Sequence, residues 1–162
     1  MAVLQHRPPS WIPTAPIVVH RSRRIAAPAP AVWRQIADHE RWPEWFTALQ
    51  RVRVTIGAEG VGGGREVKLA KPTSVTIGEV FTAWEPERTF AFTLVSAPRS
   101  LASMAEIIEL DETDGATTIS YTQGIEPSRG FGWFWKLSRH RLGHELDKAL
   151  DALAVRVESN PG

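Results

Sequence analysis

The C-terminal stretch from residue 131 to residue 157 constrains the fold more than any other part of the chain. On a helical wheel, at about 100° per residue, it separates into an apolar and a polar face. The apolar face collects Phe131, Trp135, Leu142, Leu146, Ala149, Leu153 and Val157. The opposite face collects His140, His144, Asp147, Lys148 and Asp151. A helix this long and this amphipathic must bury its apolar stripe on a large surface, which the preceding chain has to supply.

The preceding chain reads mainly as a series of strands. We expect a strand at residues 17–25, a short helix at 29–37 and a second short helix or aromatic corner at 38–46. Alternating apolar residues predict further strands at residues 52–56, 65–69, 75–84, 90–94, 104–110 and 117–121. Connections this short permit only antiparallel pairing. We therefore predict an α+β domain, in which a curved antiparallel sheet wraps around the long C-terminal helix.

The first residues differ from the rest in their proline content. Proline at this density opposes both helix formation and strand pairing, and the prolines concerned are Pro8, Pro9, Pro13 and Pro16. We expect residues 1–16 to form a proline-rich tail with Trp11 and Ile12 held against the body, and residues 17–158 to form one domain. An interaction arm is the alternative for the tail.

Charge and cysteine content exclude several classes of function. The chain has 19 basic and 18 acidic residues, a net charge of +1 that offers no long-range field for nucleic acid. Without cysteine, disulfides, thiolate nucleophiles and cysteine-bound metals are impossible. No apolar run reaches the ~20 residues of a membrane span, and no secretory signal is recognisable. We expect a cytoplasmic protein without cofactor or metal, and we interpret the basic run at residues 21–24 as a solvated strand face.

Two motifs resemble binding sites but lack essential parts. His140 and His144 have a zinc-compatible spacing, yet Arg141 stands where a metalloprotease motif needs glutamate, and both histidines lie on the polar face. We read them as solvated. The glycine-rich stretch at residues 57–64 lacks the lysine and hydroxyl ending of a phosphate loop. It is expected to be a flexible hairpin tip or, alternatively, a lid over a cavity mouth.

Several short segments resemble one known family. They are Ile25-Ala26-Ala27-Pro28, Val32-Trp33, Ile36-Ala37-Asp38, Trp42-Pro43-Glu44-Trp45, Gly78-Glu79-Val80, Trp84-Glu85-Pro86-Glu87-Arg88, Phe90-Ala91-Phe92, Glu109-Leu110-Asp111, Gly115-Ala116-Thr117 and Tyr121-Thr122. Together they resemble the polyketide cyclase/dehydrase and lipid-transport family of the START-like (SRPBCC) superfamily, over residues 17–157. The resemblance implies a helix-grip fold with an apolar cavity between helix and sheet. It also implies a role shared with aromatase/cyclases, with lipid carriers or with non-enzymatic members.

Three polar side chains are the candidates for chemistry. Alternation places Glu106 and Tyr121 on the inward face of their strands, and the wheel places Ser138 on the inward side of the helix. A carboxyl group buried among apolar neighbours has a raised pKa and can act as an acid or base. A one-residue register shift would instead turn Glu106 to solvent, and ordinary satisfied burial is the alternative for Tyr121 and Ser138. The expected ligand-binding set is Trp45, Phe90, Phe92, Met104, Glu106, Ile108, Tyr121, Phe131, Trp135, Ser138 and Leu142.

These features support three functional hypotheses. The first is a carrier or sensor for a small hydrophobic ligand such as a lipid, polyketide, isoprenoid or aromatic compound. The second is a polyketide cyclase/dehydratase-like enzyme that uses Glu106, Tyr121 and Ser138, and the third is a protein-interaction module of the same superfamily. Trp133 falls off the inward face, which fits either docking to a membrane without stable insertion or a homodimer interface.

Overall fold

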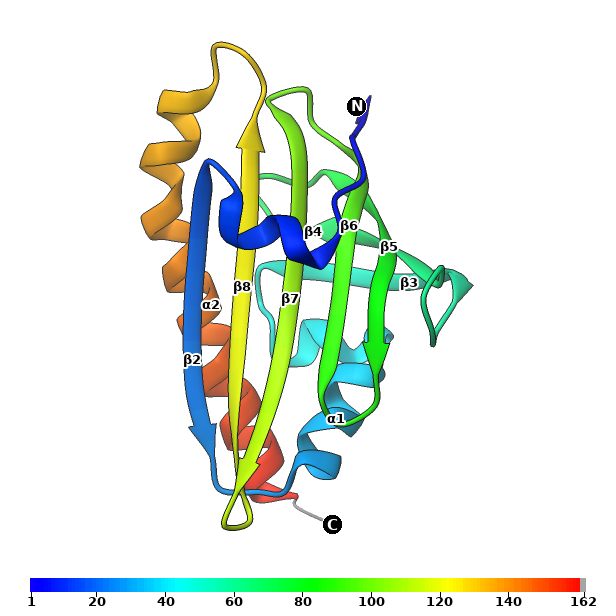
Figure 1. The fold of residues 1–162 in the computed structure, drawn as a ribbon, viewed down its shortest axis with the longest axis vertical. Helices are drawn as coiled ribbons and strands as arrows, with labels where there is room; N and C mark the ends of the chain where they lie inside the picture. Colours follow the sequence, from blue (N-terminus) through cyan, green and yellow to red (C-terminus); the bar gives the residue numbers. More distant parts are fainter. Residues whose placement is uncertain (161–162) are drawn as a thin grey trace.

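The computed structural model describes residues 1–160 and has a single sheet with one long helix packed against it (Figure 1). Its elements are β1 (Ala2–Val3), the 3-10 helix η1 (Pro9–Thr14), β2 (Ile17–Ile25), α1 (Ala29–Ala37), the 3-10 helix η2 (His39–Glu44), β3 (Leu49–Gly57), β4 (Gly64–Leu69), β5 (Thr76–Glu85), β6 (Thr89–Ala97), β7 (Leu101–Thr113), β8 (Ala116–Pro127) and α2 (Gly132–Ser159).

The sheet is antiparallel throughout, in the order β2-β8-β7-β6-β5-β4-β3, with β1 added to β6. The edges are β2 and β3, and α1 and η2 carry the chain from one edge to the other. With α2 lying on the concave face, the predicted α+β helix-grip fold is confirmed (Figure 1).

Strand register decides which side chains meet on the concave face. One row across the sheet is formed by Gln123, Glu106, Phe92 and Phe81, which are paired in succession from β8 to β5. The neighbouring row contains Tyr121, Ile108 and Phe90. Because side chains alternate along a strand, these rows face α2 while their neighbours face outward.

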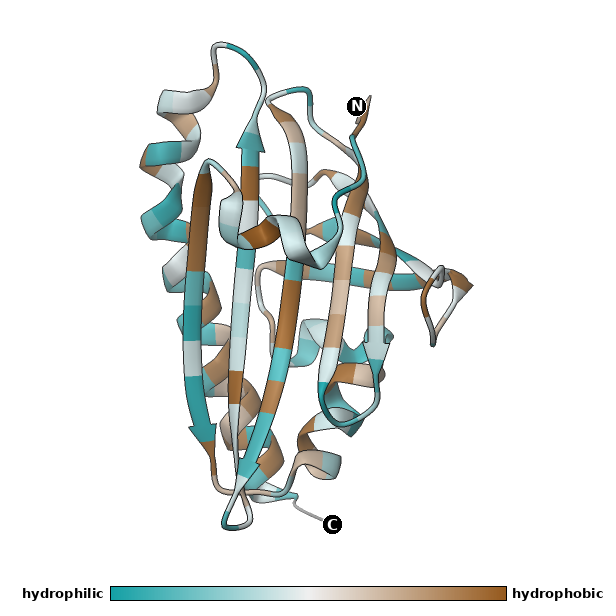
Figure 2. Ribbon diagram, viewed as in Figure 1, coloured by the Kyte–Doolittle hydropathy of each residue, from teal (hydrophilic) through white to brown (hydrophobic). Residues whose placement is uncertain are grey.

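The two halves of α2 are packed differently. From Gly143 onward the helix buries one residue per turn or more, namely Gly143, Leu146, Ala149, Leu150, Leu153, Ala154 and Val157. Between Gly132 and Leu142 no side chain is fully buried. Figure 2 shows this contrast, since the upper turns of α2 are largely teal and white. The C-terminal half therefore anchors the helix to the sheet.

The position of Phe131 differs from the one predicted from the sequence. It was expected on the inward face of the helix, but it precedes the first helical turn and its side chain is 42% exposed. The reason is tertiary: the first turns of α2 extend past the end of β2, so that edge of the sheet does not cover them (Figure 1). One tether holds this end, because the indole nitrogen of Trp135 donates a 2.9 Å hydrogen bond to the carbonyl oxygen of Ser100.

The basic run in β2 is not simply solvated. The Arg21 guanidinium donates to Asp147 at 3.1 Å and that of Arg23 to Asp151 at 2.8 Å, so both arginines join β2 to α2. A side chain at Gly143 would overlap the Arg21 guanidinium. Glycine at this position thus leaves room for the Arg21 side chain between β2 and α2. These pairs are largely exposed and contribute little stability individually.

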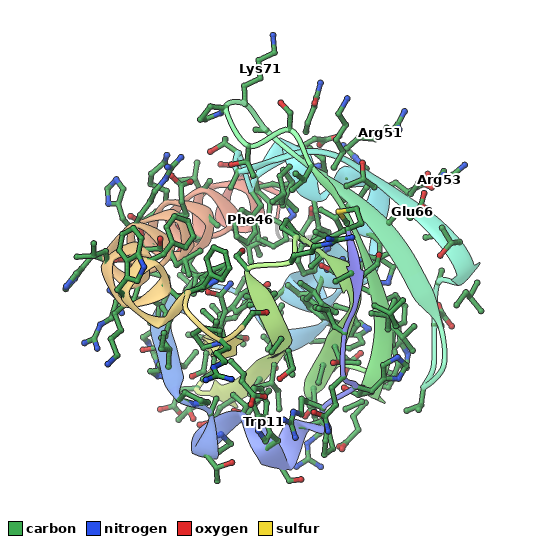
Figure 3. The ribbon with its side chains drawn as sticks, turned by 90° about the horizontal axis from the view of Figure 1, so that it is seen from above. Trp11, Phe46, Arg51, Arg53, Glu66 and Lys71 are labelled. Carbon is green, nitrogen blue, oxygen red and sulfur yellow. The ribbon has the colours of Figure 1, made fainter. Side chains whose placement is uncertain are left out.

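The proline-rich N-terminal segment packs on the convex face of the sheet. Leu4 and Ile12 are buried, and Arg7 donates to Glu126 at 2.6 Å and to Ser103 at 3.1 Å. Gly124 makes room for this segment, because a Cβ there would lie 3.1 Å from the Cα of Ile12. Figure 3 shows Trp11 and Phe46 on opposite sides of the central strands.

The prolines do not prevent all local structure in this segment. The strand β1 precedes them, and η1 begins with Pro9, where the missing N–H costs nothing. The segment is therefore a fixed cover over β7 and β8 rather than a loose tail.

The glycine-rich loop at residues 57–64 is tied to β5. The Gly62 amide donates to the Phe81 carbonyl at 2.9 Å, and the Phe81 amide donates to the Gly63 carbonyl at 2.8 Å. The loop projects from the side of the molecule opposite α2 (Figure 1). No helix among residues 1–160 is both long enough and apolar enough to cross a membrane.

Removing the buried contact of the N-terminal segment should weaken the whole domain. We expect Ile12→Ala to lower the free energy of unfolding by about 2–4 kcal/mol, because it deletes a fully buried aliphatic group. Val3→Ala is the control, since Val3 is exposed and should unfold like the wild type. Chemical denaturation measures both. Equal stability of the two variants would contradict a packed N-terminal segment.

Candidate functional site

Two polar side chains from neighbouring strands meet in the apolar interior. The Tyr121 hydroxyl on β8 donates a hydrogen bond of 2.5 Å to the Glu106 carboxylate on β7, and both side chains are buried. Register brings them together, because Glu106 pairs directly with Gln123 and lies diagonally across from Tyr121. Glu106 thus faces inward, and the alternative of a register shift to solvent is wrong.

Burial changes the acidity of this pair. Loss of hydration is the main cause that raises the Glu106 pKa to about 7, and the negative charge of Glu79 adds to it. Hydrogen bonds from Tyr121 and Gln123 lower the Glu106 pKa and so offset part of this rise. Burial and the Glu106 charge also raise the pKa of Tyr121 well above its ordinary value, so the phenol remains a donor. Near neutral pH, Glu106 can therefore either hold or release a proton.

Two buried polar atoms near the aromatic interior have no hydrogen-bond partner among residues 1–160. They are Oε1 of Gln123, which stands next to Glu106 in the same cross-strand row, and the indole nitrogen of Trp45. An unpaired buried polar atom costs about 1–3 kcal/mol. Such atoms in a folded protein call for a reason, and an acceptor beside a buried acid and a phenol is suited to a ligand hydroxyl.

A second buried polar group joins β4, β5 and η2. Arg65 lies opposite Glu79 in the ladder and donates to its carboxylate at 2.6 Å, with both side chains almost entirely inaccessible. The Arg65 guanidinium also donates to Nδ1 of His39 at 3.0 Å. His39 completes the chain by donating from Nε2 to the carbonyl oxygen of Ala58 at 2.8 Å. This arrangement requires a neutral histidine.

The same geometry explains the acidity of these groups. Burial, followed by the positive charge of Arg65, lowers the His39 pKa to about 4. Burial raises the pKa of Glu79, and the ion pair with Arg65 opposes that rise. The guanidinium carbon of Arg65 lies 3.9 Å from the ring centre of Trp42 and 4.8 Å from that of Phe92. Aromatic faces therefore stabilise a cation that water cannot reach.

Aromatic side chains fill the region between these polar groups. Trp42 and Trp45 have ring centres 4.9 Å apart, and Phe90 and Phe92 have ring centres 5.2 Å apart. Phe46 lies edge-on to Tyr121 at 6.3 Å. Seen along the long axis, Phe46 lies between α2 and the strands (Figure 3). Its ring therefore covers Tyr121 on that side.

Most of the predicted ligand-binding residues belong to this continuous packing. The buried ones are Trp45, Phe90, Phe92, Met104, Glu106, Ile108 and Tyr121. Trp135 and Leu142 are half-buried against it. Two open surface hollows, of about 350 and 320 Å³, lie elsewhere: the first at the start of α2 and the second over the outer ends of β7 and β8. Neither is lined by Glu106 or Tyr121.

Ser138 does not join Glu106 and Tyr121. It lies in the exposed half of α2, and its hydroxyl donates to the carbonyl oxygen of Phe134 in the preceding turn at 2.8 Å. The predicted convergence of three groups is thus limited to two, with Gln123 in place of the serine. The reason is the path of α2, whose first turns run beyond the sheet edge.

The Arg65, Glu79 and His39 group was missed by the sequence analysis, although part of its signal was present. Arg65 is two residues from Val67, and Glu79 is two residues from both Ile77 and Phe81. Residues two apart on a strand share a face, so both charged side chains occupy inward positions. Opposite charges at inward positions of successive strands predict a buried pair. Nothing local marks His39, because its contacts depend on where η2 packs.

The pH dependence of stability should report the burial of Glu106. Its folded pKa of about 7 exceeds the ordinary value of 4.5, so its favourable contribution is complete below pH 4.5 and disappears as pH rises to 7. We expect the stability of Glu106→Gln, relative to the wild type, to rise by about 3 kcal/mol between pH 4.5 and pH 8. Urea unfolding across this range measures the difference.

The effect of Glu106 has to be measured as the difference between the wild type and Glu106→Gln, because titration of His39 changes stability with pH in the opposite direction. Its contribution is present above pH 6.5 and disappears as pH falls toward 4, so the two slopes offset each other in the wild type. Glu126→Gln is the matched control: the pKa of Glu126 is lowered by its hydrogen bonds from Ser103 and Arg7, and its effect should be constant from pH 5 to 8. If the difference in unfolding free energy between Glu106→Gln and the wild type does not change with pH, the raised pKa of Glu106 is contradicted.

Comparison with known proteins places this geometry in context. A family model described as polyketide cyclase/dehydrase and lipid transport matches residues 16–158. An uncharacterized protein of Mycobacterium tuberculosis is 25% identical over 114 residues, which cover 70% of this chain and 68% of the relative. An uncharacterized protein of Mycobacterium bovis has the same identity and coverage.

Solved structures share the fold at low sequence identity. An aromatase/cyclase from Streptomyces sp. R1128 superposes with a TM-score of 0.76 at 16% identity, covering 88% of this chain and 93% of that one. A protein from Thermus thermophilus gives a TM-score of 0.76 at 19% identity, covering 90% and 100%. A START superfamily protein from Mycobacterium smegmatis gives 0.71 at 14% identity, covering 88% and 97%. At these identities the similarity concerns the fold alone.

Proposed function

The chain belongs to the polyketide cyclase/dehydrase and lipid transport family, and we propose that it binds a small, mostly apolar molecule between α2 and the concave face of the sheet. The observation that carries the proposal is the buried Glu106–Tyr121 pair beside the unpartnered Oε1 of Gln123. An aromatic interior with a few convergent polar atoms is typical of small-molecule sites.

The polar atoms define what the ligand should offer. Gln123 lacks a hydrogen-bond donor, and ionised Glu106 accepts hydrogen bonds as well. A hydroxyl group on an otherwise apolar molecule supplies that donor and removes an unpaired buried acceptor. The proposed ligand is therefore a hydroxylated aromatic, polyketide or lipid-like compound rather than a pure hydrocarbon.

Binding requires side chains to make room, because aromatic rings occupy the interior. Phe46 lies edge-on to Tyr121, and the half of α2 before Gly143 has no fully buried side chain. The same half is tethered to the β6–β7 connection by the Trp135 bond to Ser100. We propose that Phe46 and the first turns of α2 move together to admit the ligand, while the half after Gly143 stays anchored. Weakly packed elements are the ones that open at low cost.

The ligand preference can be measured with a matched pair of compounds. We expect 1-naphthol to displace the apolar probe 1-N-phenylnaphthylamine more effectively than naphthalene, because only naphthol donates a hydrogen bond. Gln123→Leu should remove this preference, which we expect to be about tenfold, the value of one hydrogen bond near 1.4 kcal/mol. Fluorescence titration gives both affinities for each protein.

The control is Thr122→Val, since Thr122 neighbours Gln123 in β8 but its hydroxyl is on the opposite face, bonded to His20. It should keep the preference for naphthol. No probe binding by the folded wild type, or a preference that survives in Gln123→Leu, would refute the proposed site. If the preference for naphthol behaves as expected, native mass spectrometry of protein purified from its host can identify the natural ligand.

A second candidate function rests on the buried Glu106 carboxyl, which accepts a hydrogen bond from Tyr121 and whose pKa is raised by burial to about 7. A base with this pKa can take a proton from the carbon between two carbonyl groups and return it to the alkoxide formed when a new carbon–carbon bond closes. Tyr121, whose single hydroxyl proton is donated to Glu106 in this structure, would turn to donate it to the developing oxygen charge once Glu106 has taken up the substrate proton. The similarity in fold to an aromatase/cyclase is consistent with this chemistry.

Enzymatic cyclisation has its own expected result. With a linear poly-β-ketone thioester as substrate, product formation followed by mass spectrometry should increase with pH through about 7, as Glu106 ionises. Glu106→Gln should reduce the rate by about a hundredfold or more and abolish this titration. Glu126→Gln, whose carboxyl lies outside the interior, should retain the wild-type profile. Ligand recovered unchanged from the wild type would favour the carrier function.

A further inference from the structure

The first turns of α2 expose a cluster of large apolar side chains. We define the α2 tip by Phe131, Trp133, Phe134 and Leu137, of which Trp133 is 65% and Leu137 71% exposed. The other exposed large hydrophobic residues among residues 1–160 lie at separate places along the chain: Met1, Val3, Val18, Ile56, Val61 and Val155. A concentration of this kind within two turns marks an interaction surface.

The side chains of the α2 tip form one outward face. Trp133 and Leu137 are four residues apart and therefore lie one above the other on the helix. Phe134 stands beside them, with its ring centre 6.2 Å from that of Trp133. Trp135 points the other way and is tied to Ser100, so the tip is held in place while its outward face is free. Figure 1 shows these turns standing beyond the end of β2.

Positive charge lies beside this face, since Arg141 follows Leu137 by four residues and Lys136 precedes it, whereas Arg139 follows Trp135 by four residues and lies on the other side of the helix. From Pro127 to His144 the sequence has no acidic residue but contains Arg129, Lys136, Arg139 and Arg141, in a protein whose net charge is only +1. All four side chains are exposed. None of them makes an ion pair with another residue of the described chain, whereas Arg21 and Arg23 of β2 do. The tip thus combines apolar insertion groups with unneutralised cations.

We propose that the α2 tip docks on the surface of an anionic lipid bilayer. Tryptophan and phenylalanine partition into the interface between headgroups and acyl chains, and arginine and lysine next to them are attracted to anionic headgroups. A symmetric dimer through this face would instead oppose the same cations, Lys136 and Arg141, on both copies. The charge therefore favours the bilayer over a second copy of the chain.

Docking at this place has a consequence for access to the interior. The half of α2 that carries the tip is the half without fully buried side chains, and Gly143 marks its boundary. A bilayer that holds Trp133 and Leu137 pulls on the least anchored part of the helix. The docking proposal stands on the surface alone and does not require the ligand site described above.

Vesicle flotation with the full chain tests the proposal. We expect the wild type to bind vesicles of phosphatidylcholine and phosphatidylglycerol in a 70:30 ratio, to bind pure phosphatidylcholine at least about tenfold less, and to release at high salt. Trp133→Ser/Leu137→Ser should reduce binding by about tenfold or more. Lys136→Gln/Arg141→Gln should reduce it about 30-fold, the combined effect of two interfacial cations.

Control variants distinguish the loss of the docking residues from unfolding of the protein. Ile56→Ser and Val155→Ser remove exposed apolar side chains elsewhere and should bind vesicles like the wild type. All variants should unfold at wild-type denaturant concentrations, because their substitutions are exposed. The proposal is overturned if the wild type ignores anionic vesicles, or if Trp133→Ser/Leu137→Ser binds them unchanged. It is also overturned if sedimentation shows a dimer that this variant dissociates, because the tip then joins two copies.

Discussion

The buried ion pair between Arg65 and Glu79 is the interaction on which the interior depends. It holds β4 and β5 in register from the concave side, and through His39 it fixes the corner that carries Trp42, Trp45 and Phe46. Removing one partner would leave a charge without water or counter-ion, which is far more costly than never having buried the pair. The Arg65 charge also moderates the Glu106 pKa, so the two polar groups of the interior are electrostatically linked.

The second organising feature is the division of α2 at Gly143. After this residue, aliphatic side chains of small and medium size interlock with the sheet, and Asp147 and Asp151 bind the arginines of β2. Before Gly143, the helix is held by the hydrogen bond from the Trp135 indole to the carbonyl oxygen of Ser100, and it presents aromatic and basic side chains outward. One helix thus combines an anchor with a movable, exposed segment. Both the proposed ligand entry and the proposed docking surface follow from that difference in packing.

Prediction from the sequence succeeded where periodicity is local. The helix over residues 29–37, the succession of strands along the chain and the inward position of Glu106 and Tyr121 all follow from spacings of two or of three to four residues. Prediction from the sequence failed where a side chain's surroundings depend on how a whole helix packs against the rest of the chain. Phe131 and Ser138 lie on the correct side of an ideal wheel, but the sheet does not extend beneath them. The His39 contacts likewise depend on how η2 packs and have no local signature.

Local sequence patterns set the types of element, their antiparallel order and the side chains that face inward, because backbone geometry imposes these periods within a few residues. Which inward polar groups meet was settled by the folded arrangement. Cross-strand register joins Tyr121 to Glu106 and Arg65 to Glu79, which are 15 and 14 residues apart in the chain. The folded arrangement also filled the interior with aromatic rings, and it buried the apolar stripe of α2 after Gly143 while covering Trp135 and Leu142 only in part before that residue. Each of these outcomes depends on surfaces that come together only when the chain folds.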